Sequence, residues 1–438
     1  LFKYLDEYDF EELKAACEKA YAQFDEGDAA PLVKIDSSLF MLELFHGPTC
    51  AFKDLALTLL PYLLRKGCDI CGIKEDVLIL VATSGDTGKA ALEGFKNAPG
   101  IKIMVFYPNE GVSKMQKLQM ATQEGSNVAV VAVRSNFDDC QSAVKTIFTS
   151  DACKEELLRK GYILSSANSI NFGRLAPQIA YYFSAYLDLV SSGQIEMGDK
   201  VNFAVPTGNF GNILAAYYAM RMGLPIGKLV CASNKNNILT DFIRTGVYDK
   251  RREFFKTMSP SMDILISSNL ERLLFELSGR NAVRTKLRMD KLREEGVYEI
   301  YDEEKEEIGK LFYADYCGED ETVETIYEFF EEYQYPMDTH TACAMYAAAS
   351  YMEKEKDHDT PMVVVSTASP YKFPQDVMYA LTGNDIKDSF KAIKHLNITT
   401  AMKVPKSLSG LRDKKVRFDI VADKDKLYPE VLKFAEKK

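Results

Sequence analysis

The sequence predicts an α/β protein with two open parallel sheets, each covered by helices on both faces. Continuous Val- and Ile-rich runs such as 77–82 alternate with amphipathic helical stretches such as 89–96. The alternation occurs in two sets, one before and one after the Ser/Asn-rich turn at 165–171. Runs that are apolar throughout are typical of strands buried on both faces of a parallel sheet. Two sets of such units therefore indicate two lobes.

The first half of the chain supplies one helix, a short strand-like lead-in at 31–44, and three strand–loop–helix units. Apolar residues recur at helical spacing over 9–24, which predicts a surface helix. Pro61 is expected to kink or end the helix that follows Lys53. The three units are expected at 77–82 with 89–96, at 101–107 with 113–124, and at 127–133 with 138–149.

The second half begins with a further set of alternating elements and changes character after residue 240. Acidic helical patterns between 240 and 335 predict a helical insertion with a charged, solvated face. The last 48 residues, 391–438, show mixed patterns. The other elements are expected as helices at 174–190, 213–222, 339–354 and 374–381, and as strands at 201–205, 229–232 and 362–365.

Composition restricts the class of protein. With 438 residues, 47% of them hydrophobic, the chain can bury large cores. A net charge of −10 without a long basic run argues against nucleic acid and anionic membranes as partners. No apolar run approaches the roughly 20 residues that span a bilayer, so we expect a cytoplasmic protein.

The cysteines do not form a recognisable framework. Nine in so long a chain are too sparse for a disulfide scaffold, and the odd number leaves at least one unpaired within the chain. Cys68 and Cys71 have the spacing of a zinc half-site, but no second pair completes it. We expect two small buried residues there and no metal site.

Lys53 stands in an unusual environment in the run from Leu44 to Asp54. Phe45, Phe52 and Leu55 would desolvate its ammonium, and Thr49 is expected to cap a helix that holds it in the first turn. Burial and the positive end of the helix dipole should both lower the pKa of the lysine. A neutral amine attacks aldehydes, so Lys53 is a candidate for holding pyridoxal phosphate as a Schiff base. Taken alone, a surface lysine is the more ordinary interpretation.

Several post-strand loops could bind anions, because ligands bind outside the carboxyl ends of strands in such sheets. The loop 206–212 has two glycines that let backbone N–H groups converge, although a tight turn explains it equally well. The loop 83–88 offers hydroxyls and amides suited to a carboxylate. The segment 168–174 adds amides and Arg174, which fits a dianion, and Thr367 puts a hydroxyl at a strand end, where capping a turn is its commoner use.

Taken together, these motifs resemble the threonine synthase family. They occur in the family's order, and the resemblance runs from about residue 25 to about residue 380. The segments that carry it are 44–49, 51–54, 83–88, 166–171, 206–211 and 367–370. The resemblance implies a pyridoxal-phosphate enzyme of the tryptophan-synthase-β fold type. Cys50 and Ser369 depart from the Leu and His expected at these places, which leaves the fine substrate preference open.

The resemblance also implies roles for residues. Lys53 would be the Schiff-base lysine and, once freed, the general base. The cofactor-binding residues would be Lys53, Gly208, Asn209, Phe210, Gly211 and Asn212 in the phosphate loop, with Thr367 beside the pyridine nitrogen. The substrate-binding residues would be Ser84, Asp86 and Thr87 at the carboxylate, and Ser113, Lys114, Asn168, Ser169 and Arg174 near the phosphate.

The implied reaction converts O-phospho-L-homoserine and water to L-threonine and phosphate. Lys53 would sit in a smaller lobe at 46–160, and the phosphate loop in a larger lobe at 161–385 that contains the insertion at about 240–335. An N-terminal lead-in at 1–45, truncated at its start, and a C-terminal tail at 386–438 would complete a monomer or homodimer.

Two other kinds of function remain open. A same-fold serine/threonine dehydratase or β-replacing sulfhydrylase would share Lys53 and the glycine loop, but Asp86 favours the synthase because those relatives usually have Asn there. A non-catalytic relative that binds pyridoxal phosphate or a phosphorylated ligand would also share the motifs. Lys53 argues against lost cofactor chemistry, but not against a different substrate.

Overall fold

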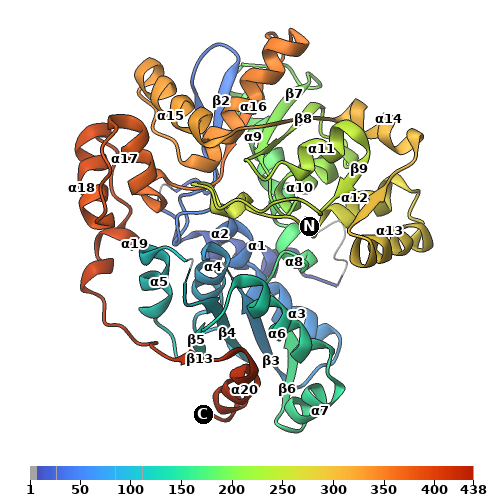
Figure 1. Cartoon of the computed structure of the whole chain (residues 1–438), viewed down its shortest axis with the longest axis vertical. Coiled ribbons are helices and arrows are strands. Elements are labelled where there is room, and N and C mark those ends of the chain that lie inside the picture. Colours follow the sequence, from blue (N-terminus) through green and yellow to red (C-terminus); the bar gives the residue numbers. More distant parts are fainter. Residues whose placement is uncertain (1–6, 26, 84, 111, 438) are drawn as a thin grey trace. The chain divides into compact units, whose positions relative to one another are not determined.

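The chain is divided between two units, and neither of them is a continuous stretch of sequence. Unit 1 consists of Leu1–Ala29, His46–Pro177 and Pro405–Lys438, and unit 2 consists of Ala30–Phe45 and Gln178–Val404. The computed structural model describes residues 7–25, 27–83, 85–110 and 112–437 (Figure 1). Each unit is built on its own sheet.

Unit 1 contains a five-stranded sheet in the order β13-β5-β4-β3-β6, and all of its paired strands run parallel. The three predicted strands of the first half are confirmed as its centre. The strands are β3 (Asp76–Ala82), β4 (Ile101–Pro108), β5 (Val128–Val133), β6 (Tyr162–Ser165) and β13 (Val421–Ala422).

Alternating side chains of these strands enter two separate cores. Val77, Ile79 and Val81 of β3 pack with residues of α3 and α4, whereas Leu78 and Leu80 pack with residues of α6, α7 and α20. Because successive strand residues point to opposite faces, a run that is apolar at every position needs helices on both faces. The helices of unit 1 are α1 (Phe10–Tyr21), α2 (Lys53–Leu57), α3 (Leu60–Ile70), α4 (Asp86–Phe95), α5 (Lys114–Ala121), α6 (Phe137–Thr149), α7 (Asp151–Arg159), α8 (Phe172–Leu175), α19 (Lys406–Ser409) and α20 (Leu427–Glu436), with short 3₁₀ turns η4 (Leu411–Asp413) and η5 (Lys424–Lys426).

Unit 2 contains a six-stranded mixed sheet in the order β1-β2-β12-β7-β8-β11. Only the pairing of β1 with β2 is antiparallel within it. Its strands are β1 (Leu32–Lys34), β2 (Leu39–Glu43), β7 (Val201–Pro206), β8 (Ile226–Ser233), β11 (Phe312–Tyr316) and β12 (Met362–Ser366). The predicted α/β class, with two sheets and covering helices, is confirmed.

The helices of unit 2 follow the predicted order. Two of them, α9 and α16, carry residues that matter for the loops at the sheet edge. The full set is α9 (Gln178–Ser191), α10 (Gly211–Arg221), α11 (Ile238–Thr245), α12 (Leu270–Leu277), α13 (Ala282–Glu294), α14 (Asp302–Leu311), α15 (Glu319–Tyr333), α16 (Thr339–Glu355), α17 (Pro374–Thr382) and α18 (Ser389–Thr400), with 3₁₀ turns η2 (Pro260–Met262) and η3 (Pro370–Lys372).

Three features differ from the sequence-based expectation. The insertion at 240–335 is not purely helical, because β9 (Val247–Asp249) and β10 (Val297–Glu299) form an antiparallel pair and β11 joins the main sheet. The expected tail at 386–438 is split, since α18 belongs to unit 2 and residues from Pro405 onward belong to unit 1. The expected lead-in 1–45 is also split, with residues 1–29 in unit 1 and residues 30–45 in unit 2. Residues 161–177 belong to unit 1 and not to the larger lobe in which they were expected.

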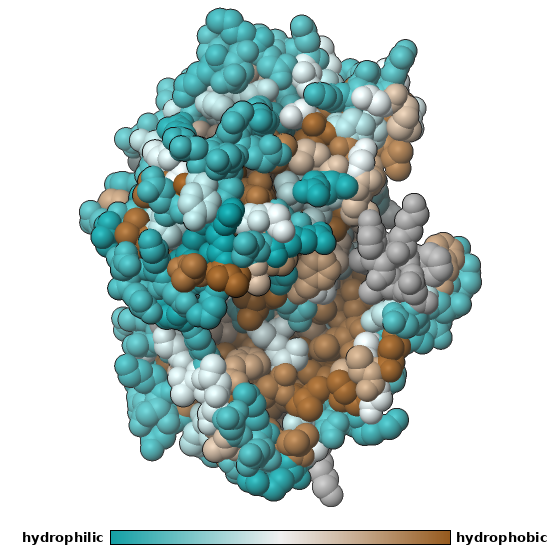
Figure 2. Space-filling model, turned by 90° about the vertical axis from the view of Figure 1, so that its right-hand side faces the viewer, coloured by the Kyte–Doolittle hydropathy of each residue, from teal (hydrophilic) through white to brown (hydrophobic). Residues whose placement is uncertain are grey.

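The surface is mainly hydrophilic on the face in Figure 2, where apolar side chains gather in the lower part of the view. Exposed apolar residues of unit 1 include Ile170 and Phe172, which are 61% and 50% exposed. In the described part of the chain, none of the helices combines the length and the apolar character that crossing a membrane requires.

Candidate active site

Lys53 is the first residue of the short helix α2, as its predicted place in a first turn requires. The helix begins after Phe52, so Thr49 is not its cap. Thr49 instead binds the carboxylate of Asp54, with its backbone N–H at 2.7 Å and its hydroxyl at 2.6 Å. This closed turn fixes the start of α2. Lys53 is only 8% exposed, in agreement with the burial inferred from its apolar neighbours.

The Lys53 ammonium faces a carboxylate. Its Nζ lies 3.5 Å from Oδ2 of Asp86, the first residue of α4, and 5.0 Å from the centre of the Phe52 ring. Burial favours the neutral amine, whereas the carboxylate favours the ammonium. Asp86 is therefore placed to stabilise the charged form of Lys53. The sequence assigned Asp86 to the substrate carboxylate and did not foresee this contact.

A glutamine fixes the Asp86 carboxylate. Gln116 in α5 is 5% exposed, and its Nε2 donates to Oδ1 of Asp86 at 2.9 Å. Its amide packs on Gly85, where an added Cβ would lie 2.5 Å from Gln116 Cδ and where φ is +148°. Glycine is therefore required at residue 85 for both space and backbone conformation. Gln116 holds one carboxylate oxygen while the other faces Lys53.

The first turn of α4 also approaches a buried arginine. Arg174 in α8 is 6% exposed, and its Nη1 donates to the backbone oxygen of Ala167 at 3.1 Å. Its Nη2 lies 3.5 Å from the hydroxyl of Thr87. Burial lowers the pKa of the guanidinium to about 10, which still leaves it charged at neutral pH. Consecutive residues Asp86 and Thr87 thus contact an amine and a guanidinium.

The segment before Arg174 is held against the sheet by its own side chains. The Asn168 amide donates to the backbone oxygen of Ala82, the last residue of β3, at 3.1 Å. Asn171 caps α8 by accepting from the N–H of Gly173. Asn168 therefore positions this loop beside the end of β3, and Ser169, which is half-buried, follows it.

The remaining predicted substrate residues are less closely linked to this group. Ser113 and Lys114 are exposed at the start of α5, where the Ser113 hydroxyl accepts from the backbone N–H of Gln116 as a helix cap. Their helix reaches Asp86 through the side chain of Gln116. Ser84 lies outside the described residues.

The glycine loop of unit 2 joins β7 to α10. Phe210 adopts a left-handed conformation with φ of +60° directly before α10, so the backbone turns sharply into the helix. At Gly208 an added Cβ would lie 2.7 Å from the backbone oxygen of Ser261, so a larger residue cannot fit without a shift. Loops of this kind direct N–H groups and the positive end of a helix dipole toward an anion.

Asn212, in the first turn of α10, has a polar atom that fits a missing group. Its Oδ1 accepts from the hydroxyls of Tyr181 and Tyr182, the latter at 2.7 Å. Burial raises the pKa of both tyrosines well above the usual value, so both remain neutral donors. The Asn212 Nδ2 is buried and has no hydrogen-bond partner among the described residues. Such an orphan donor is costly, and an anion at the loop would satisfy it.

Thr367 follows β12, and the glycine loop follows β7. These two strands are parallel neighbours, with Val364 opposite Ala204, so both loops leave the same edge of the sheet. Thr367 is 5% exposed. The structure thus brings the predicted phosphate loop and the predicted ring partner to one edge of unit 2.

The sequence missed Gln116, Tyr181 and Tyr182. Periodicity alone gave no reason to separate Gln116 from the other glutamines of its helix. The adjacent tyrosines in the apolar helix α9 offered a weak signal, since buried phenols need hydrogen-bond partners.

The residues present fit pyridoxal phosphate. Considered separately, unit 1 has a buried amine, and unit 2 has a glycine loop followed by an orphan amide donor. In the described ranges, no cluster of three or more His, Cys, Asp or Glu residues is arranged to hold a metal. Cys68 is buried as expected, whereas Cys71 is exposed.

Comparisons with known proteins agree with this chemistry. Residues 28–368 match the family model "Pyridoxal-phosphate dependent enzyme", and residues 341–429 match "Threonine synthase, C-terminal". Threonine synthase of Pseudomonas aeruginosa is 41% identical over 372 residues, which cover 85% of this chain and 76% of that protein. Human threonine synthase-like 1 is 43% identical over 384 residues, which cover 85% of this chain and 50% of that protein. The chain thus spans about half the length of the first curated relatives.

Solved structures give the same result. The PLP-bound threonine synthase of Brucella melitensis has a TM-score of 0.84 and 36% identity, covering 98% of this chain and 85% of that one. Yeast threonine synthase has a TM-score of 0.85 and 32% identity, covering 98% and 86%. The chain therefore belongs to the threonine synthase family of pyridoxal-phosphate-dependent enzymes.

Proposed function

We propose that the protein is a threonine synthase, which converts O-phospho-L-homoserine and water to L-threonine and phosphate. The observation that carries the proposal is the pairing at the start of α4. Asp86 faces the Lys53 amine at 3.5 Å, and the next residue, Thr87, faces the Arg174 guanidinium at 3.5 Å. A substrate with an amino-acid end and a phosphate end needs a reactive amine and a nearby cation.

Pyridoxal phosphate, when bound, supplies the aldehyde that Lys53 holds and a ring that withdraws electrons from the substrate carbon. The orphan amide of Asn212 and the backbone of Gly208, Asn209, Phe210 and Gly211 would hold its phosphate, and Thr367 its ring nitrogen. Thr367 carries a hydroxyl, which leaves that nitrogen without a charged partner.

The side chains of unit 1 then divide the work on the substrate. Lys53 takes a proton from the α carbon as general base, and Asp86 holds a compensating charge beside it. Arg174, with Asn168 and Ser169, binds the phosphate and stabilises the negative charge that it carries away. Ser113 and Lys114 complete the phosphate site, and Ser84 joins Asp86 and Thr87 at the substrate carboxylate.

The same contacts support a second candidate function. Human threonine synthase-like 1 shares 43% identity, so a non-catalytic relative that binds pyridoxal phosphate or a phosphorylated ligand is the alternative. A same-fold dehydratase or β-replacing enzyme is less well supported, because it would have no use for a buried Arg174 beside the substrate.

The test supplies O-phospho-L-homoserine to the purified protein loaded with pyridoxal phosphate and measures both products. Phosphate and threonine in equal amounts support the synthase. Phosphate without threonine indicates a lyase. Neither product, from protein whose absorbance shows bound cofactor, indicates a binding protein and overturns the proposal.

We further propose a cytoplasmic monomer or homodimer. No disulfide bond joins cysteines within the described part of the chain.

A further inference from the structure

The glycine loop of unit 2 rests on a second segment, residues 258–269, which we call the support segment. The hydroxyl of Ser267 donates to the backbone oxygen of Gly208 at 2.7 Å, and the N–H of Asn269 donates to the backbone oxygen of Asn209 at 3.1 Å. A Cβ added to Gly208 would lie only 2.7 Å from the backbone oxygen of Ser261, so the two segments pack closely at this point. The position of the support segment therefore sets the position of the loop.

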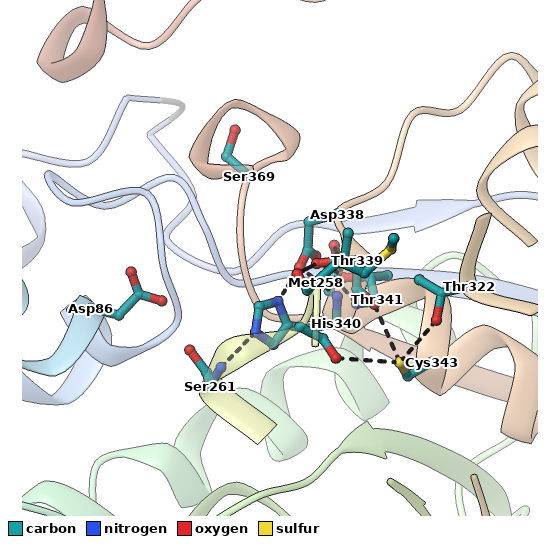
Figure 3. Close-up of polar contacts among 12 residues, drawn as sticks. Asp86, Met258, Ser261, Thr322, Asp338, Thr339, His340, Thr341, Cys343 and Ser369 are labelled. Carbon is teal, nitrogen blue, oxygen red and sulfur yellow. Dashed lines mark hydrogen bonds and ion pairs between the residues drawn. The ribbon is translucent and has the colours of Figure 1, made fainter. Parts of the chain in front are cut away.

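The support segment is tied in turn to the first turn of α16. Thr339 donates its hydroxyl to the backbone oxygen of Met258 at 2.7 Å. The backbone N–H of Ser261 donates to Nε2 of His340 at 3.1 Å. Helix α16 has 17 residues and packs against β7, β8 and β12, so it is a rigid anchor. Figure 3 shows the His340 ring between Asp338 and Ser261.

The hydrogen bonds define which nitrogen of His340 carries the proton. Because Nε2 accepts from a backbone N–H, a neutral ring must carry its proton on Nδ1. Nδ1 lies 2.8 Å from Oδ1 of Asp338, which is the acceptor that this tautomer needs. Asp338 is itself fixed as the cap of α16, accepting from the N–H groups of His340 at 2.9 Å and Thr341 at 3.3 Å. Asp338 and His340 are 0% and 3% exposed.

We propose that His340 is a positioning residue for the cofactor phosphate. Asp338 orients the His340 ring, the ring holds Ser261, and Ser261 supports the backbone of Gly208. The inference rests on the proposed role of the glycine loop in holding the phosphate. It assigns no contact between His340 and the cofactor. The alternative is that His340 only fills space, since its ring also packs on Phe373 with the centres 4.8 Å apart.

Two amide substitutions separate these explanations. His340→Gln places its side-chain oxygen near the position of Nε2, so it can still accept from Ser261. His340→Asn is too short to do so, but it can still donate to Asp338 from near the position of Nδ1. His358→Asn, at an exposed histidine, is the control. If His340→Asn does not fold, Thr339→Val removes only the tie to Met258 and serves in its place.

The first measurement is the dissociation constant of pyridoxal phosphate, by absorbance titration of the cofactor-free chain. Losing the acceptor for one buried N–H should weaken binding about tenfold in His340→Asn. His340→Gln should remain within about threefold of the parent, since its acceptor offsets most of that loss. Thr339→Val should show a smaller weakening in the same direction.

The second measurement is hydrogen exchange of the cofactor-free chain. The amides of residues 258–269 should exchange faster in His340→Asn and at the parent rate in His340→Gln. Equal behaviour of the two amide variants, in affinity or in exchange, would overturn the proposal. Neither measurement uses the substrate, so a protein that binds pyridoxal phosphate but makes no threonine disproves the proposed reaction without affecting this result.

Discussion

The candidate residues of unit 1 and those of unit 2 are supported by opposite means. In unit 1, charged side chains do the work: Lys53, Asp86 and Arg174 are all less than a tenth exposed and contact neighbours on adjoining helices. In unit 2, the glycine loop is a neutral backbone cradle held by hydroxyls and amides. The difference shows that reacting groups and anchoring groups need different kinds of support. A charge must be paired to be buried, whereas a cradle must be kept in place.

The largest expected effect comes from removing the reactive amine. Lys53→Ala should lower the turnover of O-phospho-L-homoserine by about 10³-fold or more, because it removes both the covalent anchor and the base. Borohydride treatment should fix the cofactor to the parent chain and not to this variant. Lys74→Ala, at an exposed lysine, should behave like the parent. Covalent labelling that persists in Lys53→Ala would remove the central assignment.

The glycine loop of unit 2 should lose its affinity for the cofactor when a side chain is enlarged, because it depends on close packing and not on a charged side chain. Gly208→Ala puts a methyl group 2.7 Å from the Ser261 oxygen, so the loop or the support segment must move. We expect the affinity for pyridoxal phosphate to fall about 100-fold, which corresponds to about 2.7 kcal/mol. Equilibrium titration measures it. Gly309→Ala, with no atom within 4 Å of the added Cβ and no positive φ, controls for an added methyl group without a clash. Equal affinity in Gly208→Ala and the parent would show that the loop tolerates displacement.

A substitution at Arg174 should separate the effect on substrate binding from the effect on cofactor binding. Arg174→Lys keeps the charge but loses the fork geometry, so it should raise KM for O-phospho-L-homoserine by roughly 10- to 100-fold. Because Arg174 is assigned to the substrate phosphate and not to the cofactor, the dissociation constant of the cofactor should change little. Steady-state kinetics and cofactor titration on the same preparation test both statements. A loss of cofactor affinity that matches the rise in KM would contradict the assignment to substrate.

A substitution at Gln116 tests whether the Asp86 carboxylate must be held in one orientation beside Lys53. Gln116→Leu removes the donor to Asp86 Oδ1 without adding charge, and kcat should fall about tenfold because the carboxylate beside Lys53 loses its orientation. Gln119→Leu changes a buried neighbour in the same helix whose side-chain amide has no partner among the described residues, and it should leave kcat nearly unchanged. Equal rates in Gln116→Leu and the parent would show that the pairing of Lys53 and Asp86 suffices alone.

The smallest effect concerns the anchoring of α4. Burial opposes ionisation of Glu93, but Lys89 at 2.8 Å, Lys96 and Gln123 outweigh it and lower the pKa of the carboxyl to about 2. A carboxyl whose pKa is lowered by folding stabilises the protein above its unfolded pKa near 4.5, and this stability is lost as the pH falls toward 2.

Glu93→Gln should therefore lower the free energy of unfolding by about 1–2 kcal/mol at pH 7, less than the shift alone would give, because burying Lys89 also has a cost. The difference from the parent should shrink below about pH 4, because Glu93 of the parent takes up a proton in the unfolded chain while it is still ionised in the folded one. Chemical denaturation at pH 7 and below about pH 4 measures the free energy of unfolding of the variant and the parent. Glu306→Gln, in an exposed pair, should change stability by less than about 0.5 kcal/mol. A difference that does not vary with pH would show that packing, and not charge, is responsible.

Much of the fold was predictable because strand runs that are apolar at every position have few alternatives. Val77–Ala82 and Met362–Val365 lie in strands of the two sheets. Residues 312–316 lie in the insertion that was expected to be helical, because their acidic context hides a strand, β11, whose partner β8 is more than 80 residues away. Such long-range pairing leaves little trace in local periodicity.

In the site, the sequence pointed to groups whose chemistry is unusual for their place, such as Lys53 and the glycines at 208 and 211. It could not find Gln116 or the two tyrosines on Asn212, because glutamine and tyrosine in a helix are ordinary residues. Their role depends on which side chain a distant segment brings opposite them. The pairing of Lys53 with Asp86, 33 residues apart, could likewise not be predicted, because it depends on how the two helices pack in the folded chain.

The way unit 1 closes its sheet has a consequence for biosynthesis. Strand β13 pairs with β5, and Leu427, Val431 and Phe434 of α20 complete one of the two cores of that sheet. Nearly all of unit 2, by contrast, is synthesised as one continuous stretch from Gln178 to Val404. Unit 1 therefore cannot complete this core until residues 427–434 have left the exit tunnel, although α6 and α7 can already pack on the same face. During that interval part of an apolar core is uncovered, although the lysine-bearing helix α2 has long been made.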